Sequence, residues 1–204
     1  PPRRVISAMK KESTEDFAAL DRRLRADLSP ARYRHSVSVA RLAERLARRH
    51  GGDLRRARLA GLLHDCARDF SAVRLAGEAR RKDWLGGFVP GPGRFVLLHA
   101  PVSALRARKI YGVRDRAVLA AIERHTLGHR RMGRLDKILY VADYASPDRG
   151  FPASAKMRRL ALKNLEQAFR ETMRQKLLYV LRSGRALHLE TVKMYNASAG
   201  RKGR

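Results

Sequence analysis

The chain has 204 residues, and its 46 Lys and Arg against 19 Asp and Glu give a formal net charge of +27. Hydrophobic residues make up 44% and charged residues 32% of the sequence, which is typical of a folded domain and excludes a disordered chain. No apolar run reaches the length of about 20 residues that a membrane-spanning helix needs, and the single cysteine, Cys66, excludes a disulfide framework, so we expect a cytoplasmic protein without a membrane contact.

Apolar residues recur at helical spacing along nearly the whole chain, and nowhere do they alternate as in a half-buried strand. The predicted helices cover, in chain order, residues 13–28, 30–49, 53–67, 72–82, 101–111, 115–126, 134–144 and 154–182. Ser29 and Asp53 are predicted N-caps, and Gly51 is a predicted helix stop between them. The expected fold is therefore all-α.

One domain is predicted over residues 13–196, with a basic tail at residues 1–12 and a second basic tail at residues 197–204. Glycine and proline gather between residues 86 and 93, which predicts a long loop suited to lie over a pocket. Arginines occur in nearly every segment and are not concentrated on one element, so we expect the two tails to be solvated and mobile.

Side chains that can bind metals fall on or beside the apolar faces of several predicted helices, namely His35, His64, Asp65, His125 and Asp143. One inward histidine is more often a hydrogen-bonded core residue than a ligand. Burying the whole set without partners would cost several kcal/mol per charge, which a marginally stable domain does not sustain. A shared cation removes that cost, and a mixture of imidazole and carboxylate suits iron, manganese, cobalt or zinc rather than calcium.

The order His35, His64-Asp65, Asp143 resembles the ligand series of the HD-domain metal phosphohydrolases. Within that family the chain resembles one branch, the YqeK family of symmetrical dinucleoside tetraphosphatases, over roughly residues 15 to 196. The resemblance is carried by five separate motifs in the order of that family, at residues 32–36, 60–65, 97–102, 121–128 and 135–144.

The resemblance implies an HD-domain helical bundle that hydrolyses diadenosine tetraphosphate, or a similar dinucleoside polyphosphate, symmetrically into two ADP. It implies a metal, iron in the first place with manganese or cobalt as substitutes, and a water that the metal activates as the nucleophile. The implied metal ligands are His35, His64, Asp65 and Asp143, with His64 and Asp65 as the catalytic pair.

The resemblance places two further histidines and three arginines at the site. His99 and His125 would contact substrate phosphates or hold a second cation; the first reading is favoured because no extra carboxylate is evident for a second ligand shell. Arg32, Arg68 and Arg149 lie within or near the motifs, and guanidinium groups can grip phosphate oxygens in pairs.

Three other functions compete with this interpretation. The same site could act on another nucleotide. The charge of +27 favours a nucleic-acid-binding module on an HD shell, although the aromatic residues are not interleaved with basic ones as in common RNA binders. A purely structural adaptor leaves the inward His and Asp residues unexplained. A homodimer is an alternative to the monomer.

Overall fold

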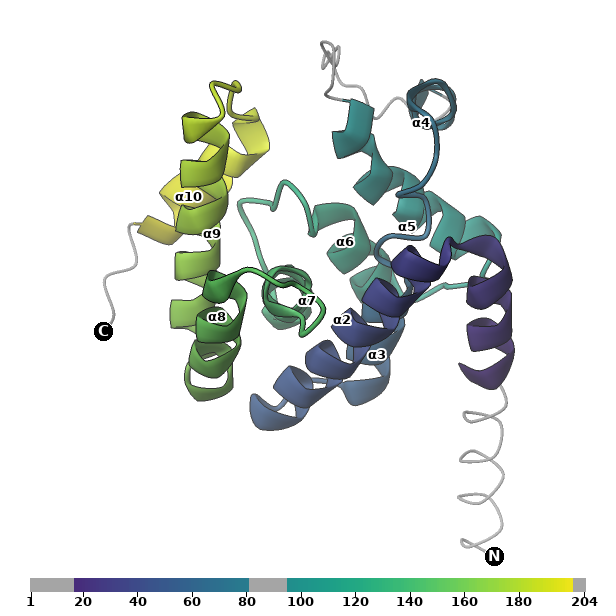
Figure 1. The fold of residues 1–204 in the computed structure, drawn as a ribbon, viewed down its shortest axis with the longest axis horizontal. Coiled ribbons are helices and arrows are strands. Elements are labelled where there is room, and N and C mark those ends of the chain that lie inside the picture. Colours follow the sequence, from purple (N-terminus) through teal and green to yellow (C-terminus); the bar gives the residue numbers. More distant parts are fainter. Residues whose placement is uncertain (1–16, 81–94, 200–204) are drawn as a thin grey trace, which may run out of the picture.

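The computed structural model describes residues 17–80 and 95–199, and these ranges contain helices and no strand (Figure 1). This confirms the predicted all-α class. A first helix spans residues 17–27. The others are α2 (Pro30–Arg49), α3 (Leu54–Leu63), α4 (Ala72–Arg80), a short 3-10 helix η1 (Phe95–Leu98), α5 (His99–Lys109), α6 (Arg116–Arg124), α7 (Arg134–Ala145), α8 (Pro152–Lys163), α9 (Leu165–Arg182) and α10 (Leu189–Ala199).

The helix boundaries follow from capping residues that the sequence supplies. The Ser29 hydroxyl accepts a hydrogen bond from the Arg32 N–H at the start of α2, and the Asp53 carboxylate accepts one from the Arg56 N–H at the start of α3. Between these helices Gly51 has a φ of +65°, a left-handed conformation that costs glycine little. The turn therefore reverses the chain and lays α3 along α2.

The helix α7 lies at the centre of the bundle, with α8 and α9 on one side and α2 and α3 on the other (Figure 1). Its residues Tyr140 and Leu139 are fully buried, and the Tyr140 ring meets Phe169 of α9 edge-on at 5.5 Å between centroids. On the other side, α2 and α3 approach so closely that a Cβ on Gly61 would lie 2.5 Å from the Cα of Ala40. This contact brings the end of α3 next to the middle of α2.

Besides the short helix η1, which was not predicted, the structure differs from the sequence-based expectation in three elements. The helix predicted over residues 154–182 is two helices, because Asn164 adopts an extended conformation and caps α9 through a hydrogen bond from the Gln167 N–H. The third helix ends at Leu63 instead of residue 67, and turns follow it. The helix α10 was not predicted, and it extends to Ala199, beyond residue 196.

The glycine-rich and proline-rich loop predicted at residues 86–93, the first twelve residues and the last five lie outside the described residues. None of the helices within the described ranges combines the length and the apolar character that crossing a membrane requires.

Candidate metal centre

Six side chains from five helices or their ends converge on one point of the bundle. His35 lies in the middle of α2, His64 and Asp65 follow α3, His99 opens α5, His125 follows α6, and Asp143 lies on α7. The first five residues are at most 6% exposed, and the Asp143 side chain is 13% exposed.

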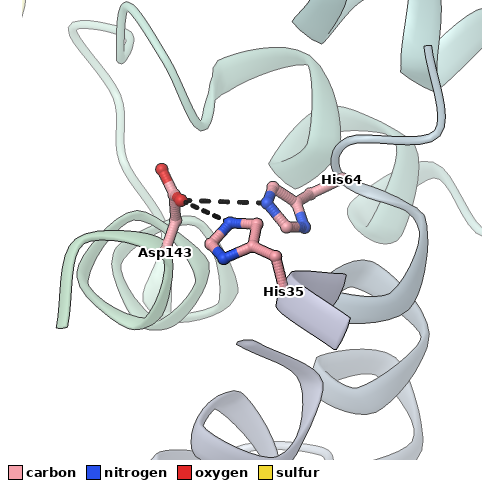
Figure 2. A group of neighbouring side chains, drawn as sticks. All are labelled: His35, His64 and Asp143. Carbon is pink, nitrogen blue, oxygen red and sulfur yellow. Dashed lines mark hydrogen bonds and ion pairs between the residues drawn. The ribbon is translucent and has the colours of Figure 1, made fainter. Parts of the chain in front are cut away.

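A first group of ligand atoms is formed by His35, His64 and Asp143 (Figure 2). The Asp143 Oδ1 atom lies 3.2 Å from the His35 Nε2 atom and 3.8 Å from the His64 Nε2 atom. The two imidazole rings meet edge-on, with 5.2 Å between their centroids. The three donors thus face one small volume between α2, α3 and α7.

A second group forms around Asp65 and shares His64 with the first. The Asp65 Oδ1 atom lies 3.2 Å from the Nε2 atom of His99 and 3.5 Å from the Nε2 atom of His125. The Asp65 Oδ2 atom lies 3.6 Å from the Nε2 atom of His64. His64 therefore links the two groups, and the Asp65 carboxylate lies at the centre of the second.

Hydrogen bonds at the far side of each ring fix which nitrogen carries the lone pair. The Nδ1 atoms of His64, His99 and His125 contact the backbone carbonyls three residues earlier, at 2.8 Å for His64 and 2.7 Å for His125. A carbonyl can only accept, so each Nδ1 donates and each Nε2 is left with a lone pair. The His35 Nδ1 atom in the same way donates to Asp148 Oδ2 at 2.7 Å.

These lone pairs provide the test of whether the residues fit a metal ion. The Nε2 atoms of His99 and His125 lie 3.1 Å apart, and the His64 Nε2 atom is buried without a hydrogen-bond partner. Acceptors that face each other and carboxylate oxygens repel one another unless a positive charge lies among them. The donor set of imidazole nitrogen and carboxylate oxygen therefore fits iron, manganese, cobalt or zinc.

The pKa shifts of the site favour the protonation states that ligands need. Burial lowers the pKa of His64 to about 4, so its ring stays neutral near pH 7. Burial alone would raise the pKa of the two carboxyls. The imidazole of His64 beside Asp65, and the imidazole of His35 with the charge of Lys176 beside Asp143, hold both pKa values well below the usual range. Both carboxylates are therefore ionised.

Two of the three predicted arginines reach the ligand carboxylates. Arg32 Nη1 donates to Asp65 Oδ2 at 2.5 Å, and Arg149 Nη2 donates to Asp143 Oδ1 at 2.6 Å. Arg68 is half-buried, and its backbone N–H donates to the Asp65 carbonyl at 2.9 Å. In the described part of the chain its guanidinium group makes no hydrogen bond or ion pair with the ligand carboxylates.

Three residues of the site were not singled out from the sequence. Asp148 orients His35, and the Thr126 hydroxyl lies 3.1 Å from the Nε2 atoms of both His99 and His125. Lys176 Nζ lies 3.8 Å from Asp143 Oδ2 and donates to the His125 carbonyl at 3.3 Å. A sequence signal for Lys176 exists, because it follows the buried Thr172 by four residues and so falls on the inner face of α9.

Comparisons with known proteins give the family of the chain. Residues 32–148 match the HD domain family. The chain is 31% identical to the symmetrical bis(5'-nucleosyl)-tetraphosphatase of Bacillus subtilis, over 85% of this chain and 92% of the relative. It is 34% identical to the enzyme of the same name from Halalkalibacterium halodurans, over 83% and 89%. A crystal structure of a predicted HD superfamily hydrolase involved in NAD metabolism, from Clostridium acetobutylicum, superposes with a TM-score of 0.83 at 32% identity and covers 91% of this chain and 98% of that one.

Proposed function

Because the chain belongs to the HD domain family and, within it, to the symmetrical bis(5'-nucleosyl)-tetraphosphatases, we propose that it hydrolyses diadenosine tetraphosphate into two ADP. The observation that carries the proposal is the convergence of several imidazole Nε2 atoms, among which that of His64 has no hydrogen-bond partner, with two ionised carboxylates at one buried point. In the reaction, water adds across the central P–O–P bridge, and each half of the substrate leaves as a nucleoside diphosphate.

The ligands that we propose for the metal are His35, His64, Asp65 and Asp143, with His64 and Asp65 at the reacting centre. A cation bound there would polarise a phosphoryl oxygen and lower the pKa of a bound water to near neutrality. The protein residues hold that chemistry in place, because Asp148 and the backbone carbonyls keep the Nε2 atoms turned inward. No Ser or Cys nucleophile is needed, and burial raises the pKa of the nearby Cys66 thiol to about 12, so it stays protonated.

The tetraphosphate of the substrate carries several negative charges, which cationic side chains at the site would offset. Arg32 and Arg149 are the groups that we propose for this role, since each guanidinium already binds a carboxylate at the edge of the site. Arg68 is retained as a proposed phosphate contact on the family resemblance alone. Lys176 adds a further positive charge beside Asp143.

His99 and His125 have two candidate roles, phosphate contact and ligation of a second cation. Their Nδ1 atoms donate to backbone carbonyls, so as neutral rings they offer lone pairs and no proton to a phosphate oxygen. Burial also lowers the pKa of His99. We therefore propose that this pair, together with the Asp65 Oδ1 atom that faces both rings, holds a second cation. Two equivalents of bound metal per chain would support this role, and one equivalent would favour phosphate contact.

The test is hydrolysis of diadenosine tetraphosphate by protein purified without chelator, after elemental analysis. We expect iron, with manganese or cobalt as working substitutes, and ADP as the only nucleotide product. His64→Gln and Asp65→Asn should each lower kcat at least a hundredfold, whereas His129→Gln, outside the metal centre, should change it little. Failure to turn over the substrate with any of these metals would refute the proposal.

The runner-up function keeps the same site and uses another nucleotide. Product analysis separates the two, because asymmetrical cleavage of diadenosine tetraphosphate yields ATP with AMP, and a different substrate yields neither product set. Since the proposed substrate and product are nucleotides of the cell interior, we place the activity in the cytoplasm.

A further inference from the structure

A groove between α8 and α9 carries an excess of positive charge and contains none of the six converging side chains of the metal centre. Its volume is about 700 Å³, and its basic residues are Lys156, Arg159 and Lys163 of α8 with Arg170 and Arg174 of α9. On α8 the three cations recur at spacings of three and four residues, and on α9 the two lie four residues apart, so each set shares one helix face. The only acidic residue in the lining is Glu171.

Two further hollows follow the groove, and each shares a lining residue with the hollow before it. Arg170 also lines a hollow of about 330 Å³ with Arg130, Arg131 and Lys137, and Arg130 in turn lines one of about 630 Å³ beside Lys193 of α10. We call the three hollows together the basic track. Three neighbouring hollows lined by basic residues suit an extended polymer better than a small anion.

The acidic residues of the basic track are already engaged. Glu166 pairs with Lys137 at 2.5 Å, Glu190 with Lys193 at 2.8 Å, and Glu171 with Arg174 at 3.9 Å. Five cations remain that form no ion pair with a carboxylate anywhere in residues 17–80 and 95–199: Lys156, Arg159, Lys163, Arg130 and Arg131. Within the described residues, these five cations of the track therefore present positive charge that no carboxylate compensates.

From this geometry we propose that the basic track binds the phosphate backbone of a single-stranded nucleic acid. The rise from Lys156 to Lys163 is about 10 Å, which spans about three phosphates of a stacked strand. Among the described residues no aromatic side chain lines the α8–α9 groove, so a stacking platform for bases is missing there. Recognition is accordingly electrostatic and independent of base sequence. RNA and DNA both carry the phosphate groups that the basic track would bind.

The experiment measures fluorescence anisotropy of labelled 20-nucleotide RNA and DNA strands over a range of salt concentrations. The variant Lys156→Gln, Arg159→Gln, Lys163→Gln should weaken binding at least tenfold at low salt. It should reduce the slope of log affinity against log salt by about 2, since each lost contact to a single strand removes about 0.7. Hydrolysis of diadenosine tetraphosphate should be unchanged, because these residues lie outside the metal centre.

A matched control removes the same charge elsewhere. Arg108→Gln, Lys109→Gln, Arg114→Gln neutralises exposed residues at the end of α5 and after it, and α5 lies at the opposite end of the long axis from α8 and α9 (Figure 1). We expect this variant to bind both strands within twofold of the unmodified protein. Equal losses in the two variants would mean that diffuse charge binds the strand, and the basic track would be refuted as a site. Circular dichroism checks that both variants fold.

Two further arms exclude other occupants. Diadenosine tetraphosphate should not displace the strand from the protein. If it displaces the strand equally from the unmodified protein and from the track variant, the nucleic acid binds at the metal centre and the proposal is overturned. Vesicles that contain anionic phosphatidylserine test whether the track binds a membrane surface instead. The proposal would also be overturned if the track variant lost vesicle binding but kept its binding of the strand.

Discussion

His64 combines two roles that depend on its burial. Its Nδ1 atom donates to the Gly61 carbonyl at the end of α3, and its Nε2 atom faces both carboxylates of the site. Because the ring is removed from water, a proton on it is unfavourable, which leaves the lone pair available to a cation. The same burial links the ring to the stability of the fold.

The lowered pKa of His64 predicts acid sensitivity of the protein after metal removal. In the unfolded chain the pKa of this histidine is about 6.5, so it becomes protonated below that pH. In the folded chain the ring stays neutral until the pH falls to about 4. The contribution of His64 to the free energy of unfolding is therefore fully present above pH 6.5. It is lost as the pH falls toward 4, and the loss amounts to about 3 kcal/mol at most. His35, whose pKa is raised, acts in the opposite sense.

Thermal melting of chelated protein between pH 7.5 and pH 4.5 measures this effect, with His64→Gln as the comparison. The unmodified protein should lose more stability than His64→Gln over that interval. Parallel curves for the two proteins would contradict the prediction.

Asp148 is predicted to act on the metal through His35. Asp148→Asn keeps an acceptor for the His35 Nδ1–H but removes its charge, so we expect metal affinity to fall by about tenfold to a hundredfold. Activity at saturating metal should fall much less. Titration with manganese or cobalt measures the affinity, and Asp53→Asn, where asparagine caps α3 as well as aspartate does, is the matched control. An unchanged metal affinity in Asp148→Asn would show that the contact has no such role.

The residues around the metal centre could be predicted unequally from the sequence. His35, His64, Asp65 and Asp143 occur in motifs or on apolar helix faces, which is a signal that one chain carries by itself. Asp148 follows the end of α7 in an irregular segment, where neither helical spacing nor apolar neighbours indicate which way a side chain points. Its role depends on a contact across 113 residues of sequence, which only the fold reveals.

At the level of helices, the crossing of α2 and α3 positions the two groups of ligands relative to each other. Gly61 allows the crossing, because a Cβ there would lie 2.5 Å from the Cα and 2.8 Å from the N of Ala40. Both of these atoms belong to backbone that cannot move without displacing α2. His35 lies five residues before Ala40 and His64 three residues after Gly61, so a change in the crossing shifts both ligands.

Gly61→Ala is therefore expected to destabilise the protein by about 1–3 kcal/mol and to lower its activity. Gly77→Ala on α4 is the control, because a Cβ there meets nothing within 4 Å. Alanine stabilises an exposed helix position by up to about 1 kcal/mol relative to glycine. Denaturant unfolding should give shifts of opposite sign, and a shift of the same sign in both variants would contradict the role assigned to Gly61.

The helices themselves were predicted well where capping residues and apolar periodicity coincide, as for α2. The break at Asn164 was missed because apolar residues continue at nearly the same spacing on both sides of it, and an asparagine inside such a pattern does not by itself stop a helix. The helix α10 was missed because Met194 is its only buried residue, which leaves no apolar stripe to recognise.

Across the whole molecule, the residues proposed to bind metal come from separate parts of the bundle: α2, α7 and the end of α3 for the first metal, with α5 and the end of α6 for the second. A cation bound in either group favours the folded chain over the unfolded one, in which the ligands are dispersed. At a hundredfold excess over its dissociation constant, such a metal adds about 2.7 kcal/mol. Each kcal/mol raises the melting temperature of a chain of this size by about 2–4 °C.

We expect manganese or cobalt to raise the melting temperature of chelated protein by about 5–10 °C, measured by differential scanning fluorimetry. Calcium at the same concentration should raise it little, because it prefers a shell of oxygen ligands. Equal effects of calcium and manganese would argue against nitrogen ligation. The oligomeric state stays a prediction, and sedimentation in the same buffers would settle whether one or two chains form the unit.

The imidazoles of His64 and His125 close the last turns of α3 and α6 as well as facing the metal. Cysteine or aspartate could replace either one as a ligand, but neither has an N–H to offer the carbonyl at that helix end. The two positions are thus constrained twice over, by inorganic chemistry and by the peptide backbone. A gradual change toward a sulfur-based or all-oxygen centre would therefore have to remake two helix ends at the same time.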